Sequence, residues 1–146
     1  MNAEILLTRL RRMLLVLSGF IFVGTIIELI LEQHTKEQLQ FVPFVLCLIG
    51  LVSVWVVLFR PHRRTIQGSR LAMMLVAAGS LLGMTIHLVN NYQFEVDIRP
   101  GAAMSELIVK ALMGASPIFA PGILALAAIL VALATYYHPA LKPRNG

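Results

Sequence analysis

Four long runs of apolar residues constrain this chain more than any other feature of its sequence. They cover residues 13–31, 41–59, 71–89 and 117–137. At a rise of about 1.5 Å per residue, each run forms a helix of roughly 30 Å, the thickness of a bilayer's hydrocarbon layer. Because the chain is 58% hydrophobic and only 13% charged, one small soluble core could not bury its apolar surface. We therefore predict a single transmembrane domain over residues 1–146, all-α and integral to the membrane, with four spans.

The connections between the runs predict how the helices are arranged. Residues 32–40 and 60–70 form short links, which favour antiparallel neighbours and an up-down-up-down four-helix bundle. The first run is longer than the roughly 7 to 15 apolar residues of a signal peptide, so we expect it to remain as a helix. Cys47 is the single cysteine, which argues against a disulfide framework and against a thiol oxidoreductase.

The basic residues predict the orientation in the membrane. Nine of the twelve fall on one side of the spans. These are Arg9, Arg11, Arg12, Arg60, Arg63, Arg64, Arg70, Lys142 and Arg144. Lys36, Arg99 and Lys110 fall on the other side. The positive-inside rule then places both termini in the cytoplasm, and the net charge of +5 indicates contact with anionic lipid headgroups and not with nucleic acid.

The third connection, residues 90–116, is far longer than a turn requires, and loops of this length usually carry function or structure. Apolar and polar residues alternate over 92–99, which predicts an outer-side extended segment. From Met104 the apolar spacing becomes helical and predicts a short amphipathic helix in the outer interface. Gly114 can end that helix, and Ser116 with Pro117 can begin the fourth span. We expect these pieces to cover the outer mouth of the bundle.

Two ionisable side chains lie within the predicted spans. Glu28 is three residues from the outer end of the first span, and His87 is two residues from the outer end of the third. A carboxylate in a membrane is costly unless it faces the interior or has a partner. We therefore hypothesise that Glu28 and His87 form a polar pair, with Asn90 and Asn91 capping the helix end nearby. A structural pair, a metal or cofactor site, and no contact at all remain the three alternatives.

Small residues predict where helices approach closely. Gly79, Gly83 and His87 are four residues apart, and the two glycines form a GxxxG pattern on one helix face. Gly24 lies in a similar small and polar face of the first span, with Thr25 and Glu28. This pattern favours helix packing.

Residues that could bind metal gather on the predicted outer side, but their spacing matches no ligand signature. They are Glu28, Glu32, His34, His87, Glu95 and Asp97. His87 is also the candidate for binding a cofactor, although the sequence requires none. His62 and His138 are expected at the cytoplasmic interface. Because no motif of a hydrolase, metalloprotease or nucleotide-binding enzyme is present, we predict no catalytic residues and no enzyme.

A succession of short motifs gives the chain a likeness to other proteins. It runs through His87, Asn91, Phe94-Glu95, Pro100, Gly114-Ala115-Ser116-Pro117, Ala120-Pro121-Gly122 and Tyr137-His138-Pro139. Over residues 71–141 the chain thereby resembles a family of small, uncharacterised bacterial four-helix membrane proteins. The resemblance implies a bacterial inner-membrane setting.

Three functions are compatible with these features. The first is a non-catalytic accessory subunit that packs in a larger membrane complex, favoured by small-residue faces and by the lack of catalytic motifs. The second is a small oligomeric transporter that uses Glu28, although transport by alternating access favours a site at the midplane. The third is a cofactor-binding or metal-binding membrane protein that uses His87. The expected partners are the lipid bilayer and either other membrane subunits or further copies of the chain.

Overall fold

The chain folds entirely into helices and turns over the part that the computed structural model describes, residues 2–36, 38–114 and 116–141. In chain order the elements are α1 (Ala3–Leu31), the 3-10 helix η1 (Gln38–Phe41), α2 (Val42–Phe59), α3 (Arg63–Ile98), α4 (Met104–Leu112), α5 (Phe119–Thr135) and the 3-10 helix η2 (Pro139–Leu141). The all-α prediction is confirmed, and the described residues contain no strand.

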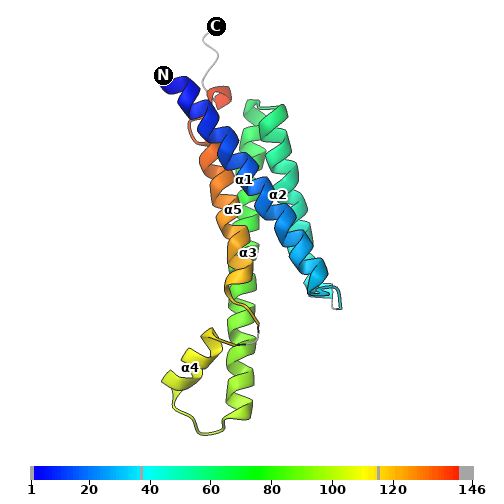
Figure 1. The fold of residues 1–146 in the computed structure, drawn as a ribbon, viewed down its shortest axis with the longest axis vertical. Helices are drawn as coiled ribbons and strands as arrows, with labels where there is room; N and C mark the ends of the chain where they lie inside the picture. Colours follow the sequence, from blue (N-terminus) through cyan, green and yellow to red (C-terminus); the bar gives the residue numbers. More distant parts are fainter. Residues whose placement is uncertain (1, 37, 115, 142–146) are drawn as a thin grey trace.

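The four longer helices pack side by side, and α4 lies against the far end of α3, away from the other three (Figure 1). Helix α1 contacts α2 and α5, and α3 contacts the same two helices. Within the described residues α1 and α3 do not touch each other, because α2 and α5 lie between them. The first turns of α1, the α2–α3 connection and η2 all lie at one end of the molecule, which we call the basic end.

The tight connection at the basic end follows from its local sequence. Thr65 Oγ1 donates a hydrogen bond of 2.8 Å to the carbonyl oxygen of Arg60. It also accepts one of 3.0 Å from the backbone N–H of His62. Because this threonine satisfies groups that a helix start leaves without partners, α3 can begin at Arg63 directly after α2.

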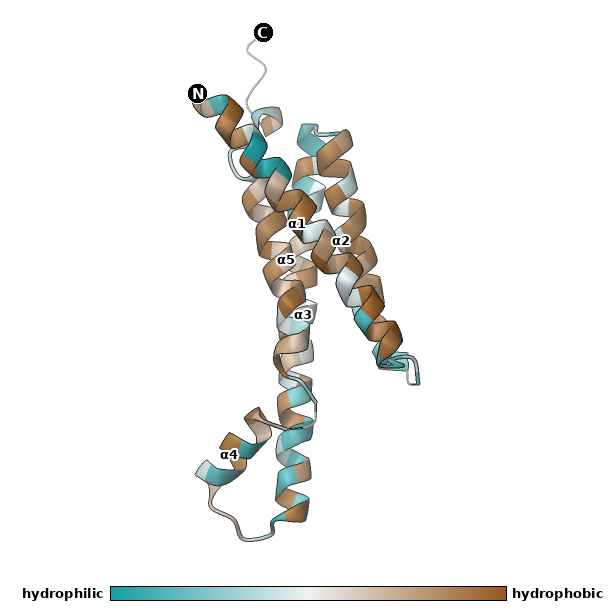
Figure 2. Cartoon of the chain, viewed as in Figure 1, coloured by the Kyte–Doolittle hydropathy of each residue, from teal (hydrophilic) through white to brown (hydrophobic). Residues whose placement is uncertain are grey.

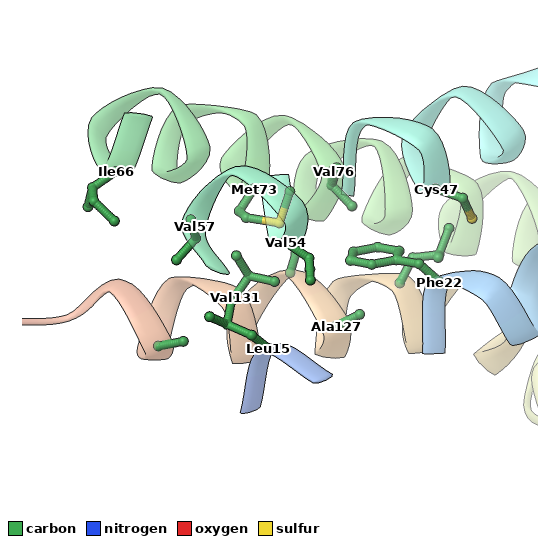
Figure 3. Packing of buried hydrophobic residues seen from close by; sticks show 13 residues of the cluster. Leu15, Phe22, Cys47, Val54, Val57, Ile66, Met73, Val76, Ala127 and Val131 are labelled. Atoms are coloured by element: carbon green, nitrogen blue, oxygen red, sulfur yellow. The ribbon is translucent and has the colours of Figure 1, made fainter. Parts of the chain in front are cut away.

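The shared core lies where α1, α2, α3 and α5 meet. Figure 3 shows Leu15, Phe22, Val54, Met73 and Val131 among its side chains. Phe22 is fully buried, and its ring lies so close to Gly50 that a Cβ on that residue would come within 2.3 Å of a ring carbon. The absence of a side chain at position 50 therefore allows α1 and α2 to pack around this ring.

The outward faces of the long helices are apolar and exposed, unlike the surface of a soluble domain. Phe20, Val52 and Leu82 are each more than half exposed. Three described helical segments are long and apolar enough to cross a membrane, and α5 is a shorter apolar helix. The three are Ala3–Leu31, Gln38–Phe59 and Arg63–Ile98.

Helix α3 is much longer than the apolar run that predicted it. Its 36 residues span about 54 Å, against roughly 30 Å for a bilayer's hydrocarbon layer. Its contacts with α5 include Gly83 on Pro121 and Met84 on Gly122, so residues 85–98 extend past the start of α5 by about 20 Å. This part is the more hydrophilic half of the helix (Figure 2). We call residues 85–98 together with α4 the arm.

The prediction of an extended segment over residues 92–99 is wrong, because α3 continues as a helix to Ile98. Where apolar residues alternate, residues four apart are also both apolar, and residues four apart lie on the same side of a helix. Phe94 therefore shares a side with Ile98, and Tyr92 shares one with Val96. Tertiary contact decides between the two conformations. Helix α4 packs against this part of α3, whereas the described residues offer no strand with which an extended segment could pair.

The boundaries of the last two helices also differ from expectation. The amphipathic helix begins at Met104 as predicted and ends at Leu112, two residues before Gly114. The next helix, α5, runs from Phe119 to Thr135, which is shorter at both ends than the predicted span 117–137. Ser116 does not cap it, because Ile118 occupies the N-cap position.

Replacement of Gly50 by alanine tests the packing of α1 on α2. The new Cβ would overlap the buried ring of Phe22, and such overpacking destabilises a core by about 1 to 3 kcal/mol, more than the roughly 1 kcal/mol that alanine gains in helix propensity. We expect Gly50→Ala to lower the thermal midpoint of the purified protein, followed by circular dichroism. Gly24→Ala is the matched control, because a Cβ there meets nothing within 4 Å. Equal midpoints for both variants would contradict this packing.

Candidate functional site

Asn91 joins the arm to the start of α5. Its side chain is buried on the face of α3 that α4 covers. Nδ2 donates to the carbonyl oxygens of Ala111, at 3.0 Å, and of Ser116, at 2.9 Å. Oδ1 accepts from the backbone N–H of Ser116 at 3.1 Å. Because one amide side chain satisfies three backbone groups of the α4–α5 connection, this connection is fixed to α3.

Gly114 makes this junction possible. A Cβ on Gly114 would lie 2.5 Å from Cγ of Asn91, a distance that real Cβ atoms do not adopt. Its backbone N–H donates to the carbonyl of Ala111 at 3.3 Å, within the turn that ends α4. Gly114 and Ser116 therefore both take part in the contact with Asn91.

A second tie joins the arm at its far end. Glu95 lies four residues after Asn91 on the same face of α3 and is also buried. Its Oε2 atom is 3.2 Å from Nε of Arg99, and Nη1 of Arg99 is 3.0 Å from Oε1 of Glu106 in α4. Oε2 of Glu95 has no hydrogen-bond partner among the described residues, so charge attraction holds this pair. One arginine thus bridges a buried carboxylate of α3 and an exposed one of α4.

The remaining surface of the arm has one apolar side. Leu107 and Ala111 of α4 are buried, while Glu106 and Lys110 lie on the side of the Arg99 ion pair. Helical spacing places Met104, Ile108 and Leu112 on the opposite side of α4 from Glu106 and Lys110. Phe94 and Ile98, four residues apart on α3, are exposed as well, and all five residues are 46% or more exposed. We call them the apolar side of the arm.

The structure does not bring Glu28 and His87 together. Glu28 is exposed on α1, and no hydrogen bond or ion pair joins it to His87 within the described residues. The arrangement of helices explains this separation, because α1 and α3 are diagonal and do not contact each other. Both residues lie near the outer ends of their predicted spans, but this similarity could not reveal which helices are neighbours. His87 is half-buried, and the ionisable side chain within its electrostatic range is His34 of the α1–α2 connection.

The other candidate metal ligands are dispersed. The described residues contain no group of three or more His, Cys, Asp or Glu side chains that could hold a metal ion. Glu95 is engaged with Arg99, and Asp97 is exposed on another side of α3. Asn90 is exposed too, and it does not cap α3, because the helix continues for two further turns.

Two of the three predicted packing glycines lie against a neighbouring helix. A Cβ on Gly79 would come within 2.9 Å of Leu46 in α2, and one on Gly83 within 3.3 Å of Pro121 in α5. Gly24 faces open space. Beside Gly83, the hydroxyl of Ser80 donates a short hydrogen bond to the carbonyl of Pro121. The Gly79–Gly83 face therefore contacts two different helices, and Ser80 adds a polar tie that the sequence pattern did not reveal.

At the basic end, two arginines cap the C-terminus of α5. Nη2 of Arg70, in α3, donates a hydrogen bond of 2.7 Å to the carbonyl oxygen of Thr135. Nε of the same arginine donates one of 3.1 Å to Oγ1 of Thr135. Nη2 of Arg11 in α1 donates to the carbonyl of Tyr137 at 2.9 Å. Cations suit the last carbonyls of a helix because these carry the negative end of its dipole. Guanidinium groups from two helices thus fix the end of a third.

His138 lies beside this cap. Its Nδ1 accepts a hydrogen bond of 3.2 Å from the backbone N–H of Ala140, so the ring is neutral in this arrangement. Burial lowers the pKa of His138, and the charges of Arg11 and Arg70 lower it further. The expected interfacial histidine is therefore part of the fold at the basic end.

The sequence contained signals for some of these ties. Asn91 stood out as a polar residue after an apolar run, and Gly-Ala-Ser-Pro stood out as a helix break. Arg70 could have been found as a charge placed directly before the apolar run 71–89. Nothing in the sequence identified the backbone partners, because those depend on which helix ends meet in space.

Comparison of the chain with models of protein families, with curated proteins and with solved structures finds no match.

Asn91→Ala tests the junction between the arm and α5. The change removes the partner of the Ser116 N–H and of the Ser116 carbonyl, and each unsatisfied buried group costs about 1 to 3 kcal/mol. The carbonyl of Ala111 keeps its bond from the N–H of Gly114. We expect a lower thermal midpoint and faster hydrogen exchange in α4 and the following connection. The neighbouring Asn90→Ala removes an exposed amide of the same size and should change neither. Unaltered exchange in Asn91→Ala would show that the amide does not hold the arm.

The pKa of His138 predicts how stability depends on pH. Because the pKa is lowered in the folded protein, the unfolded chain binds more protons at mildly acidic pH. The contribution of His138 is fully present above the unfolded-state pKa of about 6.5 and is lost as pH falls toward the folded-state value. His138→Asn retains an acceptor near the position of Nδ1 but does not titrate. We expect its thermal midpoint to fall less between pH 7.5 and pH 5 than that of the unaltered protein, and parallel curves would contradict this assignment.

Proposed function

We propose that this chain is a four-span protein of the bacterial inner membrane that serves as a non-catalytic accessory subunit in a larger membrane complex. In this proposal α1, α2, α3 and α5 form the transmembrane bundle, both termini are cytoplasmic, and the arm lies on the outer side. The family resemblance over residues 71–141 supports the bacterial setting.

The surface of the molecule supports the membrane assignment. Apolar side chains remain exposed on all four long helices, where acyl chains would cover them. The exposed tryptophan and tyrosines, Trp55, Tyr136 and Tyr137, lie toward the basic end, as expected of a belt at the level of the headgroups. Trp55 and Phe59 form one contacting pair there, with ring centroids 5.8 Å apart, and Tyr136 and Tyr137 form another at 4.6 Å. The arginines of this end support its cytoplasmic placement.

The polar groups between the helices support a structural role. Asn91, Ser80 and Arg70 each bind backbone carbonyls of another segment, and such bonds fix helices in place. Hydrogen-bonding capacity inside the molecule is thus used to hold the fold.

The arm is the observation that carries the proposal. A bilayer whose apolar layer matches α2 and α5 leaves most of the arm in water, because α3 extends about 20 Å past the start of α5. Its ties through Asn91 and Arg99 hold two helices together, yet its apolar side remains exposed. A rigid apolar surface outside the lipid is suited to contact with another protein subunit.

Gentle solubilisation of the protein from its own membrane tests this proposal. Native mass spectrometry and the absorbance spectrum of the same sample separate the candidate functions. A complex that contains other membrane subunits is the expected result. A homo-oligomer without pigment would favour a transporter, and a haem or chlorophyll band would favour a cofactor protein that uses His87; either result contradicts the accessory role.

Ile108→Gln then tests the arm as the contact surface. The change places a polar amide in the middle of the exposed apolar stripe, and we expect it to reduce the yield of the hetero-complex about tenfold or more, as for loss of a central interface residue. Lys110→Gln, on the opposite side of the same helix, is the matched control and should leave the complex intact. Circular dichroism verifies that both variants keep their helices. Equal loss in both, or in neither, would show that the partner does not use this side.

A further inference from the structure

The carboxylate of Glu28 has no partner within the molecule. It is exposed on α1 and forms no hydrogen bond or ion pair among the described residues, whereas the buried carboxylate of Glu95 is paired with Arg99. Glu28 lies three residues before the end of α1, about 5 Å inside the helix end. In the proposed membrane setting a carboxylate at this depth faces acyl chains, which is costly unless another molecule supplies a partner.

Gly24 lies one turn before Glu28 on the same side of α1. A Cβ on this glycine would meet nothing within 4 Å, whereas one on Gly79 would come within 2.9 Å of Leu46 in the neighbouring helix α2. Glycine destabilises a helix by about 1 kcal/mol relative to alanine. Close packing inside the molecule accounts for Gly79, but no contact within the described residues accounts for Gly24.

The exposed residues around Gly24 form a continuous stripe along α1, which we call the α1 seam. They recur at alternating spacings of three and four residues, the repeat by which two helices pack along a common line. The seam residues are Met13, Leu17, Phe20, Gly24, Ile27 and Leu31, all of them exposed. The buried residues of α1 lie on the opposite side and are Leu15, Ser18, Phe22 and Thr25. The seam therefore faces away from the bundle, and Glu28 flanks it where charged residues of paired helices meet.

We propose that the α1 seam packs against a transmembrane helix of the partner subunit, and that a lysine or arginine near the outer end of that helix pairs with Glu28. This inference rests on the proposed accessory function. Gly24 allows the two backbones to approach closely. The charge of Glu28 selects the partner, because acyl chains would cover the apolar residues of the seam and still leave the carboxylate unpaired.

A second copy of the chain does not satisfy Glu28. Copies in one membrane have the same orientation, so two α1 helices would pair in parallel along their seams. In a parallel pair, a residue at the flanking position of Glu28 faces the residue five positions earlier on the other helix. That residue is Val23, which has no group to pair with a carboxylate. The charge therefore favours a different chain.

A photo-crosslinking residue in the native membrane tests this contact. p-Benzoylphenylalanine replaces Leu31, which is 76% exposed beside Glu28, and mass spectrometry identifies the peptide that becomes joined to it. We expect a transmembrane peptide of another protein that carries lysine or arginine near its outer end. The same probe at Leu82, exposed on α3, is the matched control and should not capture this peptide, because α3 does not contact α1.

Substitutions then test the roles of Glu28 and Gly24 in the full-length chain that carries the probe at Leu31. Glu28→Gln should lower the yield of the cross-link about tenfold, because it leaves the partner's cation unpaired in the membrane. Glu32→Gln removes a carboxylate one turn later, past the end of α1, and should not change the yield. Gly24→Leu should lower the yield and leave the thermal midpoint of the purified chain unchanged, since a Cβ there meets nothing within 4 Å.

Three products would overturn the proposal: cross-links to lipid alone, to α1 of a second copy, or to a peptide without a basic residue. Equal yields in Glu28→Gln and Glu32→Gln would overturn it as well. Native mass spectrometry of the same samples separates this inference from the accessory function. A hetero-complex that persists without the cross-link contradicts only the contact at the α1 seam, whereas a sample without any other subunit contradicts both.

Discussion

The structure depends on the side chain of Asn91. Without its three hydrogen bonds to Ala111 and Ser116, the connection after α4 would lack its anchor on α3. The buried side-chain amide offers both a donor and an acceptor, so it bonds to the carbonyl and to the N–H of Ser116. Gly114 leaves the space that this amide occupies. A single polar residue at the end of an apolar run thereby ties the end of α4 and the segment before α5 to α3.

The two ends of the molecule use polarity in different ways. At the arm, an amide and an arginine bind the segments to each other and leave an apolar side exposed. At the basic end, Arg11 and Arg70 bind the carbonyls of α5, while other arginines remain available to the surroundings. The arm therefore offers an apolar surface, and the basic end offers exposed arginines.

The candidate site could be predicted in part. Asn91 and the Gly-Ala-Ser-Pro segment were identifiable, because polar and helix-breaking residues beside apolar runs need a structural reason. The contact between them could not be predicted, and neither could the separation of Glu28 from His87. Both depend on which helices are neighbours, and depth along a span contains no information about that. The extended segment over 92–99 failed for a related reason, because its alternating residues fit a helix equally well once α4 covers Asn91 and Glu95.

The sequence by itself determined the helical class and the segregation of charge. Apolar runs of this length have to satisfy their own backbone hydrogen bonds, and a helix does so without a partner. The tertiary structure alone decided that α1 and α3 are diagonal, that α3 continues into the arm and that Arg11 and Arg70 cap α5. These features arise from contacts between residues far apart in the chain, such as Arg70 with Thr135, and no local pattern specifies such contacts.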